Sequence, residues 1–257
     1  MIYYAKQDWI PTGKNPFSED GEYSYKWSAV IFEENTKYYA KIEENAKLFT
    51  VIISSKLDVD YERINDFINY ESKYNRNVII KSDKSIKRKL ESNKNKIREK
   101  DQRWLVHSTT EESYKLIKES NFLYSPKELR KLGKEISEIG LKHYLEPKDY
   151  SDYIMLDILN GCGELVVNSR QLGYVCTDGN MEYNPGVRLY FDAHKIIEDG
   201  LAERDGLHIL KVEKELSLDK YLVMAVTKDK AKEKVSWTPT TYTEWANNYF
   251  LRENNKK

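Results

Sequence analysis

The stretch WLVHSTTEESYKLIKESNFLYS, residues Trp104 to Ser125, decides the fold that the sequence predicts. Its apolar start is typical of a strand, and three polar residues follow at once, His107, Ser108 and Thr109. Thr110 then supplies a hydroxyl N-cap for a helix with an acidic first turn. Because free N–H groups at a helix start attract anions, this corner is either a nucleotide-binding site or an ordinary capped turn.

The composition indicates a soluble protein. The chain has 257 residues, enough for one large domain or two small ones, and 33% of them are charged. No apolar run approaches the roughly 20 residues needed to cross a bilayer, and the N-terminus has no signal-peptide pattern. We therefore expect a cytoplasmic protein with no membrane partner; the sequence leaves its oligomeric state open.

Several common site types have no counterpart in the sequence. Cys162 and Cys176 are too few for a disulfide framework, and the four histidines neither pair at metal-ligand spacing nor join the cysteines. We therefore expect no metal. A P-loop, a dinucleotide G-x-G-x-x-G motif and a G-x-S-x-G elbow are also absent, which argues against the commonest nucleotide hydrolases, Rossmann enzymes and serine hydrolases.

The pattern along the chain predicts an α+β protein with two modules. Residues 1–82 combine strand-like runs, clearest at 48–53, with a helical period at 58–70, and predict a small N-terminal α/β module. Residues 83–102 predict a basic linker helix. Residues 103–257 hold several short strand candidates and few helices, which favours a C-terminal mixed-sheet domain.

Within the C-terminal domain, turn residues separate the expected elements. A helix beginning at Ser125-Pro126 is expected to reach about Ile136. Gly161 and Gly163 predict a turn between two of the strands. Strands are expected at 153–156, 165–167, 187–191, 207–212 and 221–226, and an aromatic-rich terminal helix or turn at 237–250.

The charge distribution leaves non-catalytic functions open. The whole chain is neutral, with 42 basic and 42 acidic residues, but Lys81 to Arg103 holds ten basic and four acidic residues. This run is either a solvated helix face or a surface for phosphates. Together with the 20 tyrosines it keeps open a nucleic-acid-binding protein without catalysis. A protein-interaction or inhibitor protein with exposed aromatics near the C-terminus is a further alternative.

The His107-Ser108-Thr109 strand end, with the helix and the SNFLYS segment behind it, resembles the ADP-ribosyltransferase superfamily. In that family the first strand ends in His or Arg followed by a hydroxyl residue, and a helix leads into a second short strand. The resemblance covers about residues 104–226. It implies that NAD is a substrate and that the protein is a transferase, a bacterial toxin or defence-type effector that modifies a protein or nucleic-acid acceptor.

The resemblance also implies roles for individual residues. His107, with Ser108 and Thr109, would hold the NAD ribose. The aromatic that stacks on nicotinamide would be Tyr190, with Tyr124 as a rival. The acid that supports the departing ribosyl cation would be Glu213, with rivals Glu215 and Glu164.

The chemistry of NAD cleavage gives each of these candidate site residues a possible role, and each residue also has a purely structural interpretation. A carboxylate beside an oxocarbenium-like centre stabilises charge that develops in the transition state, as Glu213 would. Arg188 could neutralise the pyrophosphate through a bidentate contact. Alternatively, Arg188 and Tyr190 are ordinary strand positions, Glu213 lies in a solvated turn, and His107 is a core histidine.

Overall fold

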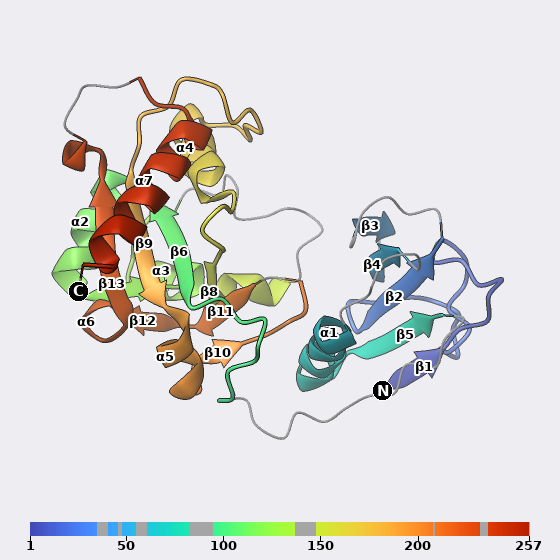
Figure 1. Cartoon of the computed structure of the whole chain (residues 1–257). Coiled ribbons are helices and arrows are strands. Elements are labelled where there is room, and N and C mark those ends of the chain that lie inside the picture. The colour runs from blue at the N-terminus through green and yellow to red at the C-terminus, as the bar shows by residue number, and fades with distance from the viewer. Residues whose placement is uncertain are drawn as a thin grey trace. The chain divides into compact units, whose positions relative to one another are not determined.

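The computed structural model describes residues 1–34, 41–45, 48–54, 61–82, 95–136, 148–207, 209–231 and 236–256, with the backbone alone for 41–45, 148 and 150. Its internal contacts divide the chain into two units (Figure 1). The N-terminal unit comprises Met1–Ser92, Tyr144–Pro147 and Arg204–Leu207, and the C-terminal unit comprises the remainder. Helices accompany a largely parallel sheet and several small antiparallel sheets, which confirms the expected mixture of helices and strands.

Five described strands form the sheet of the N-terminal unit. Their order is β1 (Ile2–Tyr4), β5 (Asn77–Lys81), β2 (Trp27–Glu33), β4 (Leu48–Ser54) and β3 (Lys41–Asn45). The first four are parallel and β3 runs antiparallel to β4. β4 is buried along nearly its whole length. Its predominantly apolar sequence, interrupted only by Thr50 before Ser54 ends it, fits this place, because a parallel sheet is covered on both faces.

Each face of this sheet has its own apolar cluster. Helix α1 (Tyr61–Lys73) joins β4 to β5 and packs Ile64, Phe67 and Ile68 against one face. The helix predicted over 58–70 is thus confirmed from Tyr61 onward, and 58–60 lie outside the described residues. The other face is covered by the segment between β1 and β2. There the indole N–H of Trp9 donates to the Tyr23 hydroxyl at 3.0 Å.

The basic run at residues 83–102 forms no helix in its described part. Residues 83–94 of the expected linker helix lie outside the described residues, and 95–102 form turns and irregular chain. The Asp101 carboxylate accepts from the Arg98 backbone N–H, which closes a turn. Ile97 packs against the core of the C-terminal unit. The segment has too few apolar residues to bury a helix face, and Ile97, this turn and a contact between the Asp101 carbonyl and the His194 ring help to hold it.

The described residues of the C-terminal unit form three small antiparallel sheets. The first has the order β13 (Leu222–Thr227), β9 (Val187–Asp192), β6 (Trp104–Thr109). The second has the order β10 (Ala202–Glu203), β11 (Leu210–Glu213), β8 (Tyr153–Leu156), and the third pairs β12 (Glu215–Ser217) with β7 (Phe122–Tyr124). An isolated antiparallel bridge between Val106 and Asp157 places β6 beside the end of β8.

The helices of this unit are α2 (Glu111–Ser120), α3 (Pro126–Lys131), α4 (Gly163–Leu172), α5 (Ala193–Glu198), α6 (Leu218–Tyr221) and α7 (Pro239–Asn254), with 3-10 turns η1 (Lys148–Asp152) and η2 (Lys228–Lys230). Thr110 caps α2 as predicted, because its hydroxyl accepts from the Ser113 backbone N–H at 3.2 Å. The predicted helix after Ser125 is also present but ends at Lys131. Gly133, with a φ of 69°, follows it in a left-handed conformation.

Helix α4 replaces the strand that was predicted at Leu165–Val167, so that prediction is wrong. The valines there favour a strand locally, but Glu164, Val167 and Asn168 are all buried, and their spacing is that of one helix face. The helical terminus predicted over 237–250 is confirmed as α7, whose capping box is formed by Thr238 and Thr241.

Two cores flank β9. Leu189 and Phe191 point into one cluster, whereas Tyr190 points into a second cluster that α7 covers with Tyr242, Ala246 and Phe250. This alternation decides which predicted site residues are accessible.

Candidate active site

His107 lies inside β6, because the strand continues to Thr109 instead of ending at the polar tip. Its Nδ1 is 3.2 Å from the backbone carbonyl oxygen of Met155 in β8. A carbonyl can only accept, so Nδ1 carries the proton and Nε2 is left as an acceptor. Nε2 has no hydrogen-bond partner among the described residues.

The imidazole of His107 is neutral at neutral pH. The pKa of His107 is lowered to about 4, chiefly by burial, while the hydrogen bond to Met155 acts in the opposite direction and the positive charge of Arg170 adds a smaller lowering effect. A neutral imidazole with a fixed tautomer can accept a hydrogen bond from a ligand hydroxyl.

Ser108 points into the core on the opposite side of β6. Its hydroxyl donates to Glu164 Oε1 at 2.6 Å, and Arg188 Nη1 lies 3.0 Å from the same carboxylate oxygen. Arg188 is fully buried. The expected contact between Arg188 and a pyrophosphate therefore does not fit this structure, because the guanidinium is enclosed and already paired.

The ion pair belongs to a larger buried network. Tyr183 donates to the second oxygen of Glu164 at 2.5 Å, and Asn247 Oδ1 accepts from Arg188 Nε at 3.3 Å and from the Tyr190 hydroxyl at 3.0 Å. Arg188 Nη2 donates to the Leu159 carbonyl, to which Asn247 Nδ2 also donates, at 2.7 Å. The network connects β6, α4, β9 and α7.

Tyr190 has no face open to a ligand. It is completely buried, and its ring stacks on Phe250 with centroids 4.1 Å apart and an interplanar angle of 9°. Tyr124, the rival aromatic, is half-buried at the end of β7, and its ring lies 5.8 Å from that of Phe122. It stands directly opposite Glu215 in the antiparallel pair with β12. Of the two tyrosines, only Tyr124 presents ring surface to solvent.

Glu213 is exposed at the end of β11 and forms an ion pair with Lys214 at 3.5 Å. It pairs across the sheet with Tyr153 of β8, two residues from the Met155 carbonyl that holds His107. β8 lies between β6 and β11, so His107 and Glu213 stand on opposite edges of β8, two strands apart. Glu215 is also exposed, whereas Glu164 is enclosed in the ion pair with Arg188.

Thr109 is buried where β6 ends, and Gly186 packs against its backbone. A Cβ at Gly186 would stand 2.0 Å from the Thr109 carbonyl oxygen, so only glycine fits this approach. Ser108 and Thr109 thus hold the strand that presents His107, and neither hydroxyl faces a ligand site that the structure shows.

Sequence reasoning missed two groups that act on His107. One is the Met155 carbonyl, which no side-chain pattern can reveal. The other is Arg170 on α4, one of 42 basic residues, whose helix was read as a strand and a turn.

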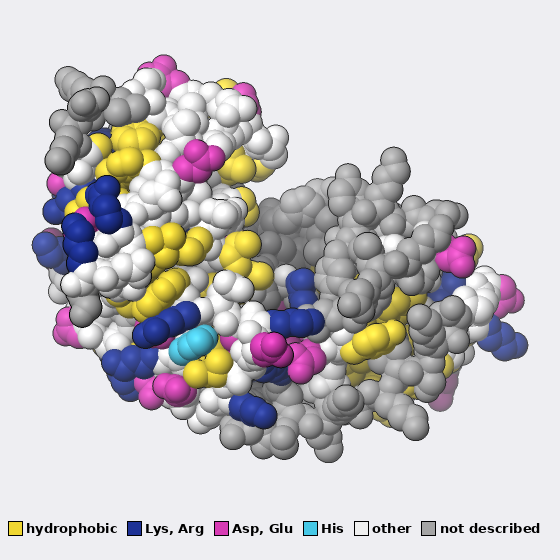
Figure 2. All heavy atoms as spheres, in the orientation of Figure 1, with side chains coloured by type: hydrophobic (Ala, Val, Ile, Leu, Met, Phe, Trp, Pro, Cys, Tyr) yellow, Lys and Arg dark blue, Asp and Glu magenta, His cyan; other side chains and the backbone are white. Residues whose placement is uncertain are grey.

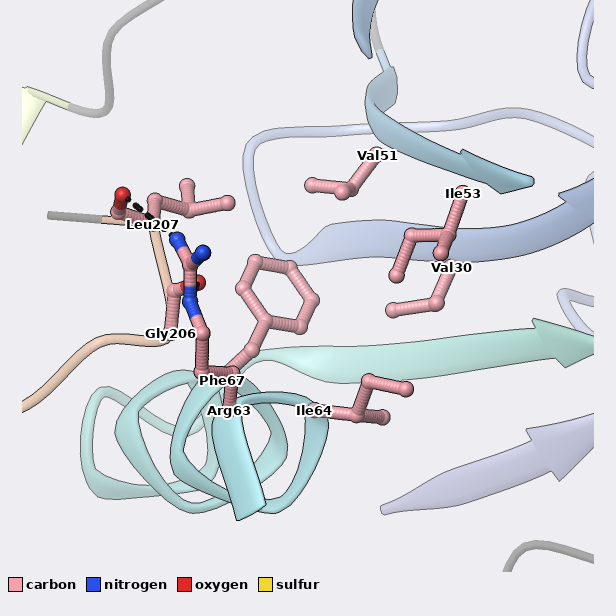
Figure 3. Close-up of a pocket in the computed structure, with 8 residues that line it drawn as sticks. All are labelled: Val30, Val51, Ile53, Arg63, Ile64, Phe67, Gly206 and Leu207. Atoms are coloured by element: carbon pink, nitrogen blue, oxygen red, sulfur yellow. Dashed lines mark hydrogen bonds between the residues drawn. The ribbon is translucent and has the colours of Figure 1, made fainter. Parts of the chain in front are cut away.

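Figure 3 shows an apolar pocket in the N-terminal unit, lined by Val30, Val51, Ile53, Arg63, Ile64, Phe67, Gly206 and Leu207. Arg63 is engaged there, because its Nε and Nη2 donate to the carbonyls of Gly206 and Leu207 at 3.1 and 3.0 Å. The pocket lining holds no carboxylate, histidine or hydroxyl, so we place no catalytic site in it.

The described residues contain no cluster of three or more His, Cys, Asp or Glu side chains that could hold a metal ion. Within the same ranges, no helix is both long enough and apolar enough to cross a membrane. On the face that Figure 2 shows, basic side chains lie among acidic ones. Comparisons with known protein families, curated proteins and solved structures gave no match.

Proposed function

We propose that the protein is an NAD-consuming ADP-ribosyltransferase with its site at β6, β8 and the end of β11. The observation that carries the proposal is the state of His107, whose Nδ1 is fixed on the Met155 carbonyl and whose Nε2 is left as a neutral acceptor. The first strand of the family named above places a histidine in this role for the NAD ribose. The fold class of the C-terminal domain, as an ADP-ribosyltransferase-like type, is part of the proposal.

The proposed chemistry assigns one task to each exposed group. A ribose hydroxyl of NAD donates to His107 Nε2, which orients the sugar. The bond between the ribose and nicotinamide breaks, and its electron pair leaves with the nicotinamide nitrogen. The Glu213 carboxylate stabilises the oxocarbenium-like centre, and an acceptor nucleophile then bonds to the ribose carbon and loses its proton.

Four of the residues assigned from the sequence change their roles in this proposal. Tyr124 replaces Tyr190 as the ring beside nicotinamide, because Tyr190 is enclosed between β9 and α7. Arg188, with Ser108 and Thr109, positions β6 instead of touching NAD. The acceptor, a protein or a nucleic acid, remains to be identified, and a toxin or defence role depends on it.

The proposal is tested by nicotinamide release from NAD with purified full-length protein, alone and with protein or nucleic-acid acceptors. We expect His107→Ala and Glu213→Gln each to reduce the rate at least a hundredfold, because each removes a group that acts on the reacting sugar. Glu119→Gln, an exposed change on α2, is the matched control and should leave the rate unchanged.

Two results would count against the proposal. One is the absence of NAD turnover with every acceptor, together with no rise in the thermal midpoint on adding NAD. The other is turnover that survives His107→Ala. Oligonucleotide binding that weakens steeply with salt and is unaffected by Glu213→Gln would instead support the non-catalytic nucleic-acid-binding alternative.

A further inference from the structure

We propose that Lys214 is a positioning residue, whose backbone conformation sets the Glu213 carboxylate in place relative to the Tyr124 ring. The roles of Glu213 and Tyr124 in the reaction rest on the proposed function. Their placement by Lys214 depends on backbone hydrogen bonds and strand pairing alone.

Lys214 has a left-handed backbone conformation, with a φ of 65°. The other described residues with a positive φ are glycines and two asparagines, Asn75 and Asn121. Glycine has no Cβ and asparagine tolerates this region, whereas a lysine is strained there. A strained residue persists only where the surrounding structure enforces its conformation, and such residues cluster at functional sites.

Two backbone hydrogen bonds enforce the conformation of Lys214. Its N–H donates to the Asp152 carbonyl at 3.0 Å, and its own carbonyl accepts from the Ser125 N–H at 2.7 Å. Asp152 comes directly before β8, and Ser125 comes directly after Tyr124, the last residue of β7. Lys214 is therefore tied to two separate segments, one of which carries the proposed ring.

Lys214 is also the single residue between β11 and β12, which belong to different sheets. Before it, Glu213 pairs with Tyr153 of β8. After it, Glu215 pairs with Tyr124 of β7. A left-handed residue between extended residues bends the chain, and here the bend leads from one sheet to the next. The conformation of Lys214 thus determines where Glu213 lies relative to Tyr124.

The charge of Lys214 contributes less to this arrangement than its backbone. The side chain is 65% exposed, and its Nζ lies 3.5 Å from Glu213 Oε1. An exposed ion pair of this kind contributes little free energy. We therefore expect a residue that tolerates the left-handed region to replace the lysine, and a β-branched residue to fail.

The first test measures NAD turnover by full-length protein with substitutions at Lys214. Lys214→Val should lower kcat at least tenfold with little change in KM, because a displacement of about 1 Å between reacting groups can cost about a hundredfold in rate. Lys214→Asn should retain at least half of kcat. It should also raise the thermal midpoint by about 2–4 °C, because asparagine relieves the strain. Lys118→Val, at an exposed position of α2, is the control.

A second pair of variants alters the same corner from Ser125. Its φ of −66° is the value that proline prefers, so Ser125→Pro suits the local backbone but removes the N–H that donates to Lys214. Ser125→Ala keeps this N–H and loses only the hydroxyl that caps α3 at the Glu128 N–H. We expect Ser125→Pro to lower kcat as Lys214→Val does, and Ser125→Ala to lower the thermal midpoint alone.

Three results would overturn the positioning role. Equal losses of kcat in Lys214→Asn and Lys214→Val would show that the ammonium acts. Full kcat in Lys214→Val would show that the backbone conformation is unimportant, and a lower thermal midpoint in Lys214→Asn would contradict the strain. Failure of both Lys214→Val and Ser125→Pro to fold would reduce the corner to a structural element, which also overturns the proposal.

NMR of the Tyr124 ring separates this inference from the proposed function. The ring signals, assigned with Tyr124→Phe, should shift in Lys214→Val and stay in place in Lys214→Asn. That result in a protein without NAD turnover would support the positioning role of Lys214 and contradict the transferase. Signals that shift in both variants, or in neither, would overturn the positioning role whether or not NAD is consumed.

Discussion

The chemistry of His107 is determined at the scale of single residues by one backbone carbonyl and by burial. The Met155 carbonyl fixes the proton on Nδ1, and the surrounding protein makes the charged form unfavourable. A histidine exposed at a loop tip, as the sequence suggested, would keep an ordinary pKa near 6.5 and a mobile ring. The extension of β6 to Thr109 therefore changes what this side chain can do.

The depressed pKa makes stability depend on pH in a defined direction. Because the folded pKa of about 4 lies below the ordinary 6.5, the unfolded chain takes up a proton first as the pH falls. The contribution of His107 is complete above pH 6.5 and is lost as the pH falls towards 4. Linkage gives an upper bound of about 3 kcal/mol for this loss.

Urea unfolding between pH 7 and 4.5 measures this effect. We expect the wild type to lose more stability over this range than His107→Gln, which has no proton to gain at that position. Parallel curves for the two proteins would show that the imidazole titrates normally and is not held neutral by its surroundings.

Part of the site could be predicted from residues alone. The order of His107, Ser108 and Thr109 after an apolar run identified the strand that carries the imidazole. Sequence could not show that Arg188 and Tyr190 are enclosed, because adjacent strand positions alternate between two faces and here both faces are buried. Tyr124 differs from Tyr190, and Glu213 from Glu164, in burial, which depends on the tertiary fold.

At the scale of elements, one buried ion pair joins strands and helices that are far apart in sequence. Glu164 opens α4, Arg188 lies in β9, and Ser108 in β6 touches both. Leu165–Val167, predicted as a strand, is part of helix α4. The helix buries one face, with Glu164 in its ion pair to Arg188 and with Val167 and Asn168 beside it. The β-propensity of Val166 and Val167 stabilises a strand by less free energy than the burial of this helix face contributes to stability. Strands such as β4 and β9, which are rich in β-branched, aromatic and aliphatic residues, were predictable.

Replacing Arg188 by methionine should therefore destabilise the C-terminal unit strongly. The change leaves the Glu164 carboxylate buried without its counter-ion, which typically costs about 3–5 kcal/mol. Chemical denaturation followed by tryptophan fluorescence measures it. Lys131→Met breaks an exposed ion pair with Glu128 and is the matched control, expected to cost less than about 1 kcal/mol. Equal effects of the two changes would contradict a structural role for Arg188.

At the scale of the whole molecule, the N-terminal unit is assembled from separate parts of the chain. Residues 204–207 lie in it, although they follow β10 and precede β11 of the C-terminal unit. Leu207 packs against the cluster beneath α1, and Arg63 donates to the Gly206 and Leu207 carbonyls. Composition indicated a break near residues 83–102 but gave no sign of this segment, because Asp205-Gly206 has the sequence of an ordinary turn.

A fragment ending at Ser92 should be less stable than the same residues in the full chain. It lacks Leu207 and leaves Arg63 without two of its acceptors. In the full-length protein, Leu207→Ala should reduce amide exchange protection in α1 and β5 by about 1–2 kcal/mol, as expected for a partly buried leucine. Leu201→Ala, at an exposed position, is the control. A fragment as protected as the intact protein would contradict this account.

The discontinuity at residues 204–207 also limits how this polypeptide can be rearranged. A unit that is built from separate segments of the chain cannot be separated from the rest by a single cut. Transferring the N-terminal unit to another protein therefore requires that residues 204–207 are transferred with it. Recombination at a single breakpoint would give chimaeras with an incomplete N-terminal unit. We therefore expect the two units to be inherited together.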